Sequence, residues 1–327
     1  MQAACKSAPK RVVLSDAENY NILKAAEIVL NEHLAELILL GNREVINKVI
    51  RENELELDSV SIIDPKSDEE KERVNSFANI LYQKRQRKGI TLHDARDRML
   101  HRNYFSAMLL ETGAADAVLS GLTLNYPETI RPALHVIGRR PDAGIVSGMY
   151  IVNTKDGPLF LSDCTVNLEP NVNDLVEITL QTAEAVRRFR TEPTIALLSY
   201  SNFGSVKGDL QNLLQETVSI LHRDHPELVV DGEMQAHLPF RPELMERDHA
   251  FSKLLGGEAN TLIFPNLSSS NIAYNLLKEV AGIEKIGPIL MGLEKPVHIL
   301  QLNATVREIV DMIALAVVDA QSREQKV

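Results

Sequence analysis

The stretch RVVLSDAENYNILKAAEIVLNEHLAELILLGNREVINKVI, residues 11–50, predicts the fold class of this protein. The apolar and β-branched run Arg11–Leu14 is typical of a buried strand, and the amphipathic stretch Asn21–Leu30 is typical of a helix. The same two patterns follow in Ala35–Gly41 and Arg43–Glu52. Strands that alternate with helices along a chain form mostly parallel sheets covered by helices. We therefore expect an α/β fold.

The alternation is interrupted near the middle of the chain. A third strand is expected at Ser59–Asp64, but from about residue 145 two longer strands, Ile145–Val152 and Leu159–Val166, flank the turn residues Asp156-Gly157. This pattern predicts an antiparallel hairpin. A second series of strands and helices begins at Thr194.

The length and the hairpin together indicate two domains. At 327 residues the chain exceeds the size at which one hydrophobic core usually stops growing. We expect two three-layer α/β domains, the first formed by residues 1–145 and 302–327 and the second, inserted into it, by residues 146–301.

Composition and charge exclude several classes of protein. The net charge of -10 argues against a general nucleic-acid or anionic-membrane surface, which needs an excess of Lys and Arg. No window approaches the roughly 20 apolar residues of a membrane span. Cys5 and Cys164 are too few for a disulfide framework, so we expect reduced thiols and a cytoplasmic location, and no spacing predicts a metal site. Met1–Lys10 reads as the tail of a linker, and we expect the chain to be a piece of a longer protein.

A second informative stretch is Lys295–Val310. It predicts a short strand, a turn, and a helix that opens with Thr305 and carries Glu308 three residues later, a reciprocal capping pattern. The end of a strand before a helix is a common place for functional groups in α/β proteins. Here the turn holds Gln301 and Leu302, which supply neither a nucleophile nor a positive charge.

Other candidate groups are weak on residue type alone. Arg85 lies in a basic run that is more typical of a solvated helix end than of an anion site, and Arg131 lies about one turn inside a predicted helix. The loop 199–208, between a predicted strand and helix, offers hydroxyls, backbone N–H groups and Lys207 to an anion, but it matches no phosphate-binding motif. His237 is more typical of a structural histidine.

A family resemblance is carried by sequence blocks spread over nearly the whole chain. They are Ala115–Gly121, Thr129–Leu134, Ser162–Asn167, Leu198–Ser201, Asp231–Gln235, Asn260–Asn266, Ser270–Tyr274 and Ile286–Leu293. With these blocks in this order, the chain resembles the phosphate acetyltransferase and phosphate butyryltransferase family. The resemblance implies domains similar to those of isocitrate and isopropylmalate dehydrogenases, a ligand cleft between them, and dimers as the usual unit.

The resemblance also implies roles for single residues. In active members the thiolate of coenzyme A attacks the carbonyl of acetyl phosphate without a metal, and the arginines that handle phosphate and coenzyme A correspond to Arg85 and Arg131. The cleft cysteine corresponds to Cys164.

Active members carry a Ser-Arg-Gly-Cys sequence before the last helix, where this chain has Gln301-Leu302-Asn303-Ala304. Glu308 stands where the resemblance places the Asp that serves as the base, and its capping pattern with Thr305 favours a structural role. Loss of one oxyanion donor typically costs roughly 100- to 1,000-fold in rate.

The pattern from Leu300 to Val310, with Ala316–Gln321, is similar to the C-terminal phosphotransacetylase-like domain of two-part bacterial NADP-dependent malic enzymes. This similarity implies a domain that has lost acetyl transfer, binds acetyl-CoA, and regulates an attached malic enzyme domain by feedback inhibition. NADP and a divalent metal would belong to that other domain.

We therefore expect a catalytically inactive domain with acetyl-CoA as its allosteric ligand and no cofactor of its own. Alternatives that stay open are an active phosphate acetyltransferase and a dimerisation module with a vestigial cleft. Expected partners are acetyl-CoA, the malic enzyme domain and a second copy in a homodimer, with no nucleic acid and no membrane. The residues expected to bind acetyl-CoA are Arg85, Arg131, Cys164, Ser199, Ser201, Asn202, Gly204, Ser205, Lys207, Asn271, Tyr274 and Gln301.

Overall fold

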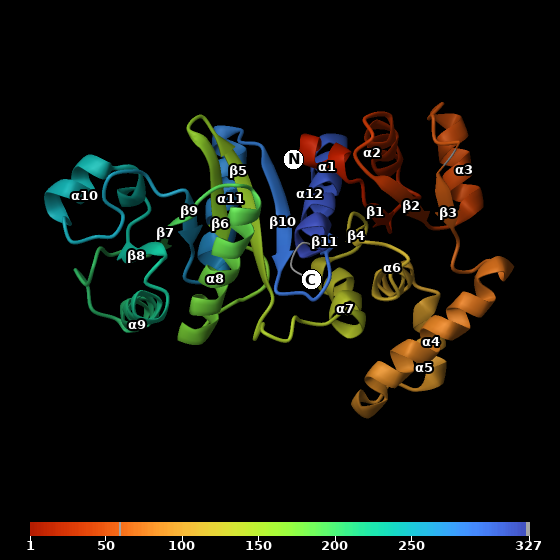
Figure 1. Ribbon diagram of the computed structural model, residues 1–327, viewed down its shortest axis with the longest axis horizontal. Coiled ribbons are helices and arrows are strands. Elements are labelled where there is room, and N and C mark those ends of the chain that lie inside the picture. The colour runs from red at the N-terminus through yellow and green to blue at the C-terminus, as the bar shows by residue number, and fades with distance from the viewer. Residues whose placement is uncertain (59, 325–327) are drawn as a thin grey trace. The chain divides into compact units, whose positions relative to one another are not determined.

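The computed structural model describes residues 1–58 and 60–324 of the chain (Figure 1). The described residues divide into two compact units: unit 1 is Met1–Arg140 with Leu293–Val327, and unit 2 is Pro141–Gly292. Position 59, where a strand was expected to begin, and residues 325–327 lie outside the described residues.

The sheet of unit 1 is parallel and has the strand order β11-β4-β1-β2-β3. Its strands are β1 (Arg11–Leu14), β2 (Glu36–Leu40), β3 (Ser61–Ile63), β4 (Ala117–Ser120) and β11 (Val297–Ile299). Because β11 pairs with β4, the C-terminal part of unit 1 begins at Leu293. This start lies before the boundary between residues 301 and 302 that we expected. The parallel pairing confirms the α/β class.

The α-helices of unit 1 are α1 (Gln2–Ser7), α2 (Tyr20–Asn31), α3 (Arg43–Glu52), α4 (Lys71–Arg85), α5 (Leu92–Met99), α6 (Arg102–Glu111), α7 (Tyr126–Val136) and α12 (Val306–Glu324). Of these, α4 and α5 pack on each other and on α6. The helices α2 and α12 pack on each other, as do α6 and α7, and in Figure 1 β1 and β4 lie between these two pairs. The apolar residues of α12 that the sequence singled out are buried there, among them Ile309, Met312 and Ile313.

The N-terminal segment is helical, which differs from the expectation. Met1–Lys10 was predicted to be linker-like, but Gln2–Ser7 forms α1, which packs against α12. Cys5 is fully buried, and its Sγ lies 3.4 Å from the carbonyl oxygen of Ala314. The burial of Cys5 and the contact of its thiol with α12 explain why a segment rich in small and polar residues forms a helix here.

Unit 2 is built on a mixed sheet with the strand order β10-β5-β6-β9-β7-β8. The strands are β5 (Ser147–Thr154), β6 (Gly157–Ser162), β7 (Thr194–Leu198), β8 (Val229–Met234), β9 (Thr261–Ile263) and β10 (Lys285–Met291). β5 and β6 form the predicted hairpin, with Thr154 opposite Gly157, and β10 adds to its other side in antiparallel fashion. The remaining strands pair in parallel.

A hydrophobic core lies on each face of this second sheet. On one face α8 (Val172–Arg188) and α9 (Asp209–Asp224) contribute Leu175, Ile178 and Leu214 to a core that includes Ile195 and Ile263. On the other face α10 (Pro242–Asp248) and α11 (Leu267–Ala281) cover a core that includes Leu161, Leu198 and Phe264. Unit 2 is therefore a three-layer α/β structure.

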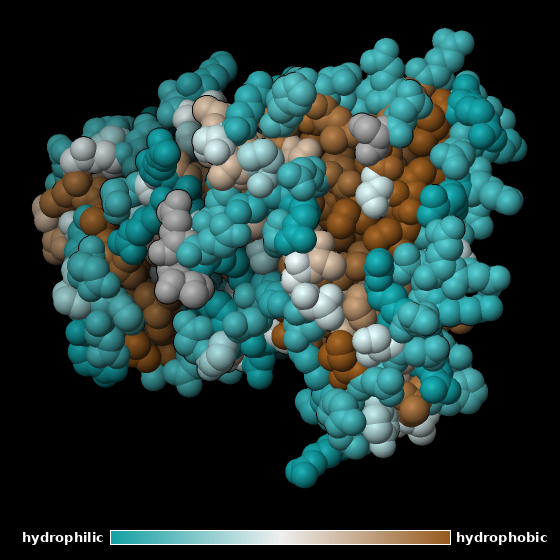
Figure 2. Space-filling view, turned by 45° about the vertical axis from the view of Figure 1, so that its right-hand side comes forward, coloured by the Kyte–Doolittle hydropathy of each residue, from teal (hydrophilic) through white to brown (hydrophobic). Residues whose placement is uncertain are grey.

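The outward faces of the elements are largely polar. Figure 2 shows hydrophilic residues over most of the visible face and a broad hydrophobic area in the upper right of the view. Among the residues that the structure describes, no helix combines the length and the apolar composition needed to cross a bilayer.

Candidate functional site: a cationic pocket in unit 1

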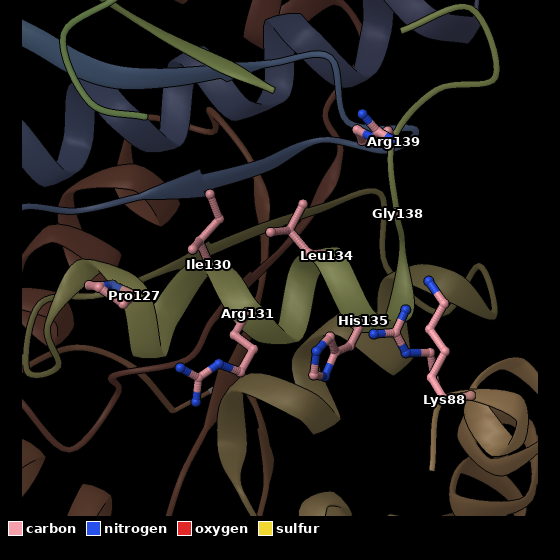
Figure 3. Close-up of a pocket in the computed structure, with 9 residues that line it drawn as sticks. Lys88, Pro127, Ile130, Arg131, Leu134, His135, Gly138 and Arg139 are labelled. Carbon is pink, nitrogen blue, oxygen red and sulfur yellow. The ribbon is translucent and has the colours of Figure 1, made fainter. Parts of the chain in front are cut away.

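Unit 1 contains a pocket of about 550 Å³ that is rich in positive charge (Figure 3). Its lining consists of Arg85, Lys88, Pro127, Ile130, Arg131, Leu134, His135, Gly138 and Arg139. The structure thus brings together Arg85 and Arg131, which lie 46 positions apart in the sequence.

The local structure explains why these cations converge. Arg85 is the last residue of α4, and Lys88 follows in the 3-10 turn Gln86–Lys88, so the basic run lies at the end of a helix. Asn125 caps α7 by accepting the N–H of Glu128, and Arg131 and His135 then lie one helical turn apart. Figure 3 shows both side chains projecting from the same side of α7, opposite Ile130 and Leu134.

The charges in this pocket are not compensated. Of the residues that the structure describes, no carboxylate lines the pocket. The side chains of Arg85, Lys88, Arg131 and Arg139 also make no ion pair within the described part of the chain. Arg85 Nε is buried without a hydrogen-bond partner among the described residues. Unpaired guanidinium groups around a cavity favour an anionic ligand, above all one with phosphate oxygens.

His135 adds a neutral donor to the pocket. Its Nδ1 lies 2.8 Å from the hydroxyl of Tyr104 and 3.2 Å from Arg98 Nη1. Because a guanidinium can only donate, Nδ1 accepts and the ring proton lies on Nε2. Burial and the charges of Arg85, Arg98, Arg131 and Lys88 lower the pKa of His135 to about 4. The imidazole is therefore neutral near pH 7.

The turn after β11 has the capping geometry that the sequence predicts. The N–H of Thr305 donates to Glu308 Oε2 at 2.8 Å, and the N–H of Glu308 donates to Thr305 Oγ1 at 3.3 Å. Leu302 is 57% exposed, and Asn303 adopts a left-handed φ of 64°, which asparagine tolerates. Gln301 and Leu302 leave this turn without a charged group.

The remaining predicted residues lie in unit 2, beginning with Cys164. This residue is 1% exposed, within the core that also contains Tyr150 and Tyr274. Burial and the nearby Asp163 carboxylate raise the pKa of the Cys164 thiol well above its ordinary value. The thiol is therefore protonated and shielded.

The loop 199–208 holds a carboxylate of the protein itself. Ser201 Oγ and the N–H of Gly204 each donate to Glu233 Oε1 at 2.8 Å, and Glu233 is fully buried. Elsewhere in the loop, the N–H of Asn202 donates to Ser205 Oγ at 3.1 Å, and Ser199 Oγ accepts from Gln211 at 3.2 Å. Lys207 is exposed. Ser201 and Gly204 thus already bind an internal anion.

Asn271 and Tyr274 lie near the start of α11. Asn271 Nδ2 donates to the Tyr274 hydroxyl at 3.3 Å, and the rings of Tyr274 and Tyr150 lie in contact, tilted by 31°, with centroids 4.6 Å apart. Lys285 Nζ lies 4.8 Å from the centroid of each ring. Tyr274 is therefore part of a buried aromatic cluster.

Sequence reasoning missed several residues of the cationic pocket. Lys88 belongs to a basic run that was read mainly as a solvated surface, whereas His135 and Arg139 carried no assignment. The spacing of four between Arg131 and His135 was an available signal, because side chains four apart share a helix face.

Taken together, the fold and the pocket define an α/β protein with a cationic pocket in unit 1. The family described as phosphate acetyl/butaryl transferase matches residues 1–317, and the chain belongs to this family. It is 33% identical over 323 residues to the phosphate acetyltransferase of Clostridium acetobutylicum, an alignment covering 97% of this chain and 96% of that enzyme.

Two further comparisons refine this placement. The NADP-dependent malic enzyme of Escherichia coli is 35% identical over 97% of this chain, but the chain spans only 42% of that protein's length. A crystal structure of a phosphotransacetylase from Streptococcus pyogenes matches with a TM-score of 0.89 at 29% identity, covering 98% of this chain and 97% of the other. The family therefore includes relatives of both kinds that the sequence resembles.

Proposed function

We propose that the chain transfers an acetyl group between coenzyme A and phosphate. The observation that carries this proposal is the pocket of uncompensated cations, Arg85, Lys88, Arg131 and Arg139, in a member of the phosphate acetyl/butaryl transferase family. The 33% identity to a phosphate acetyltransferase, over nearly the full length of both chains, supports this proposal. We also infer, from the family resemblance, that the fold is similar to that of isocitrate dehydrogenase.

The proposed reaction needs anion binding more than any other property. An oxygen of phosphate attacks the thioester carbonyl of acetyl-CoA, a C–O bond forms, the C–S bond breaks, and the thiolate leaves and takes up the proton that phosphate gives up. The arginines hold the phosphate groups in place and offset their charge. Because Leu302 brings no charge to the turn, we expect turnover to be roughly 100- to 1,000-fold below that of a relative with arginine there.

A second candidate function is acetyl-CoA binding without acetyl transfer. The observation that favours it is the uncharged turn at Gln301 and Leu302, together with the identity to a malic enzyme. In this case acetyl-CoA regulates an attached malic enzyme domain, to which NADP and a divalent metal would belong. A ligand can do so only through different affinities for two states of the protein.

Two measurements on the chain separate these candidates. The first follows thioester formation after mixing the protein with coenzyme A and acetyl phosphate. The second is calorimetric titration with acetyl-CoA. Turnover supports the first proposal, and saturable binding without turnover supports the second. Absence of both turnover and binding at about 1 mM ligand contradicts the two candidates together.

Variants connect the result to the pocket. Arg131→Gln is expected to weaken acetyl-CoA binding at least about tenfold, since a charged hydrogen bond is worth about 1.5–3 kcal/mol. Arg87→Gln is the matched control, because Arg87 belongs to the same basic run and is exposed but does not line the pocket. If the two substitutions weaken binding equally, the cationic pocket is not where acetyl-CoA binds.

A further inference from the structure

The chain leaves unit 1 after Arg140 and returns to it at Leu293. Within unit 1 the two ends are paired: Arg139 and Leu293 form an antiparallel bridge, and the N–H of Glu294 donates to the carbonyl oxygen of Gly138 at 3.1 Å. We call residues 138–140 and 293–294 the crossover segments. Gly138 and Arg139 also line the cationic pocket, on the segment that follows α7 (Figure 3). The backbone that carries Arg139 is therefore held by the segment at Leu293.

Arg323, near the end of α12, holds the second crossover segment. Its Nη1 donates to the carbonyl oxygens of Leu293 and Glu294 at 2.7 and 3.0 Å. Its Nε and Nη2 donate to the two carboxylate oxygens of Asp319, each at 3.1 Å. This bidentate pair fixes the plane of the guanidinium, so that Nη1 is directed at the carbonyls. The side chains of Arg323 and Asp319 are 18% and 6% exposed, so water screens these contacts little.

Asp319 also connects α12 to the sheet of unit 1. Its Oδ2 lies 3.2 Å from Nε2 of His298 on β11, and the His298 side chain is fully buried. The strand β11 begins at Val297, four positions after Leu293. The carboxylate that orients Arg323 is therefore itself in contact with the sheet, which anchors the second crossover segment to the core of unit 1.

Arg323, Asp319 and His298 do not line the cationic pocket. Their link to it is Arg139, which is exposed and makes no ion pair within the described part of the chain. The position of its charge therefore depends on its backbone. We propose that Arg323 is a positioning residue, oriented by Asp319, and that it places the cation of Arg139 in the pocket through the crossover segments. This inference rests on the anion binding of the proposed function, but not on acetyl transfer.

Calorimetric titration of the intact chain with sulfate measures the effect on anion binding. Arg323→Met removes the donors and is expected to weaken sulfate binding about threefold to tenfold, a usual range for changes that act through a network of contacts. Arg323→Lys keeps a charged donor near the carbonyls and should recover part of the loss; it carries the test if Arg323→Met does not fold. In a chain with Arg139→Gln, Arg323→Met should have no further effect, because the cation that it positions is absent.

Arg11→Met is the matched control. Arg11 also pairs with a carboxylate through two nitrogens, that of Asp116, and donates to the carbonyl oxygens of Ala114 and Gly113, each at 3.0 Å. It does not line the pocket. This variant should lose stability in urea unfolding but bind sulfate like the native chain. A loss of sulfate affinity as large as that of Arg323→Met would show a general effect of stability and overturn the inference.

Hydrogen exchange measured by mass spectrometry reports on the crossover segments directly. Arg323→Met should speed exchange at the amides of residues 138–140 and 293–294, whereas Arg11→Met should not. Unchanged exchange there, or additive effects of Arg323→Met and Arg139→Gln on sulfate binding, overturns the inference. So does a native chain that binds no sulfate at about 50 mM. If sulfate binds as expected but the chain neither forms the thioester nor binds acetyl-CoA, the proposed function fails while this inference stands.

Discussion

The hydroxyl of Tyr104 lies 2.8 Å from Nδ1 of His135, and this contact holds the imidazole in the cationic pocket as a neutral donor. The pKa of His135 in the free pocket is about 4. A bound anion offsets the surrounding positive charge and raises that pKa toward the ordinary value of roughly 6.5. Binding then takes up a proton, so affinity for an anion of constant charge should rise as the pH falls from about 6.5 toward 4.

Sulfate is a suitable probe because its charge is constant over this range. Calorimetric titration at several pH values should show tighter sulfate binding at lower pH for the native chain and a flat profile for His135→Gln. Tyr104→Phe, which removes the hydroxyl, controls for the hydrogen bond to Nδ1. A native profile as flat as that of His135→Gln would contradict the role given to this histidine.

Leu302→Arg should increase the rate of acetyl transfer. The side chain is 57% exposed, so an arginine can replace it without disturbing the core. We expect the rate of thioester formation from coenzyme A and acetyl phosphate to increase about 100-fold or more, the usual effect of one oxyanion donor. Leu302→Gln, polar but uncharged, should leave the rate unchanged. A similar gain from glutamine would show that charge is not the missing property.

Thr305→Ala should destabilise unit 1 without altering ligand binding. The substitution removes the hydroxyl that accepts the N–H of Glu308 at the start of α12. Loss of such a cap typically costs about 1 kcal/mol. Urea unfolding measures the change, and Thr305→Ser, which keeps the hydroxyl, should be close to native. Equal losses in the two variants would argue against the capping role.

Glu233→Ala should destabilise unit 2 strongly. The buried carboxylate accepts from Ser201 and Gly204, and from Gln215 Nε2 at 3.1 Å. Each buried donor left unpaired costs about 1–3 kcal/mol, so we expect a loss of roughly 3 kcal/mol or more in the free energy of unfolding. Glu233→Gln keeps one acceptor oxygen and should lose less. A near-native stability of Glu233→Ala would show that the loop 199–208 does not depend on this carboxylate.

The homodimer expected from the resemblance leads to a prediction about α11. Ile272, Leu276 and Val280 are 67%, 60% and 77% exposed and repeat every four residues on one helix face. Because this stripe is centred on Leu276, two antiparallel copies related by a two-fold axis would place Leu276 against its counterpart and Ile272 against Val280 of the other copy. We therefore propose a second copy of the chain as the partner of this face.

Light scattering after size-exclusion chromatography tests that pairing. Leu276→Glu should convert a dimer into a monomer, since it buries a charge at the centre of the stripe. Leu168→Glu, at another leucine of unit 2 that is 63% exposed, should leave the mass unchanged. A native chain that is itself monomeric would exclude the proposal.

Much of the fold was predictable because its signals are local. The strand Arg11–Leu14 and the helix Arg43–Glu52 begin and end where the apolar pattern predicts. The Asp156-Gly157 turn predicted the β5–β6 hairpin, and the capping pattern of Thr305 and Glu308 is present in the structure. In each case neighbouring residues determine the conformation through backbone preference or short-range hydrogen bonds.

Other elements could not be predicted in this way. The helix α1 has little apolar periodicity of its own and is ordered by packing against α12, from the other end of the chain. The strand β11 joined unit 1 because it pairs with β4, a contact between segments about 180 residues apart. Local patterns do not specify which distant segment a strand will pair with.

The candidate site also combines features that the sequence predicts with features that depend on tertiary contacts. The sequence by itself determined the family, the arginines at positions 85 and 131, and the uncharged turn at Gln301 and Leu302. Only the tertiary structure decided that Lys88, His135 and Arg139 join those arginines around one cavity. It also decided that the loop 199–208, a weak candidate for an anion site, binds the carboxylate of Glu233. The physical reason is that residue type sets the charge of a group, whereas its free or paired state depends on neighbours that folding brings from elsewhere in the chain.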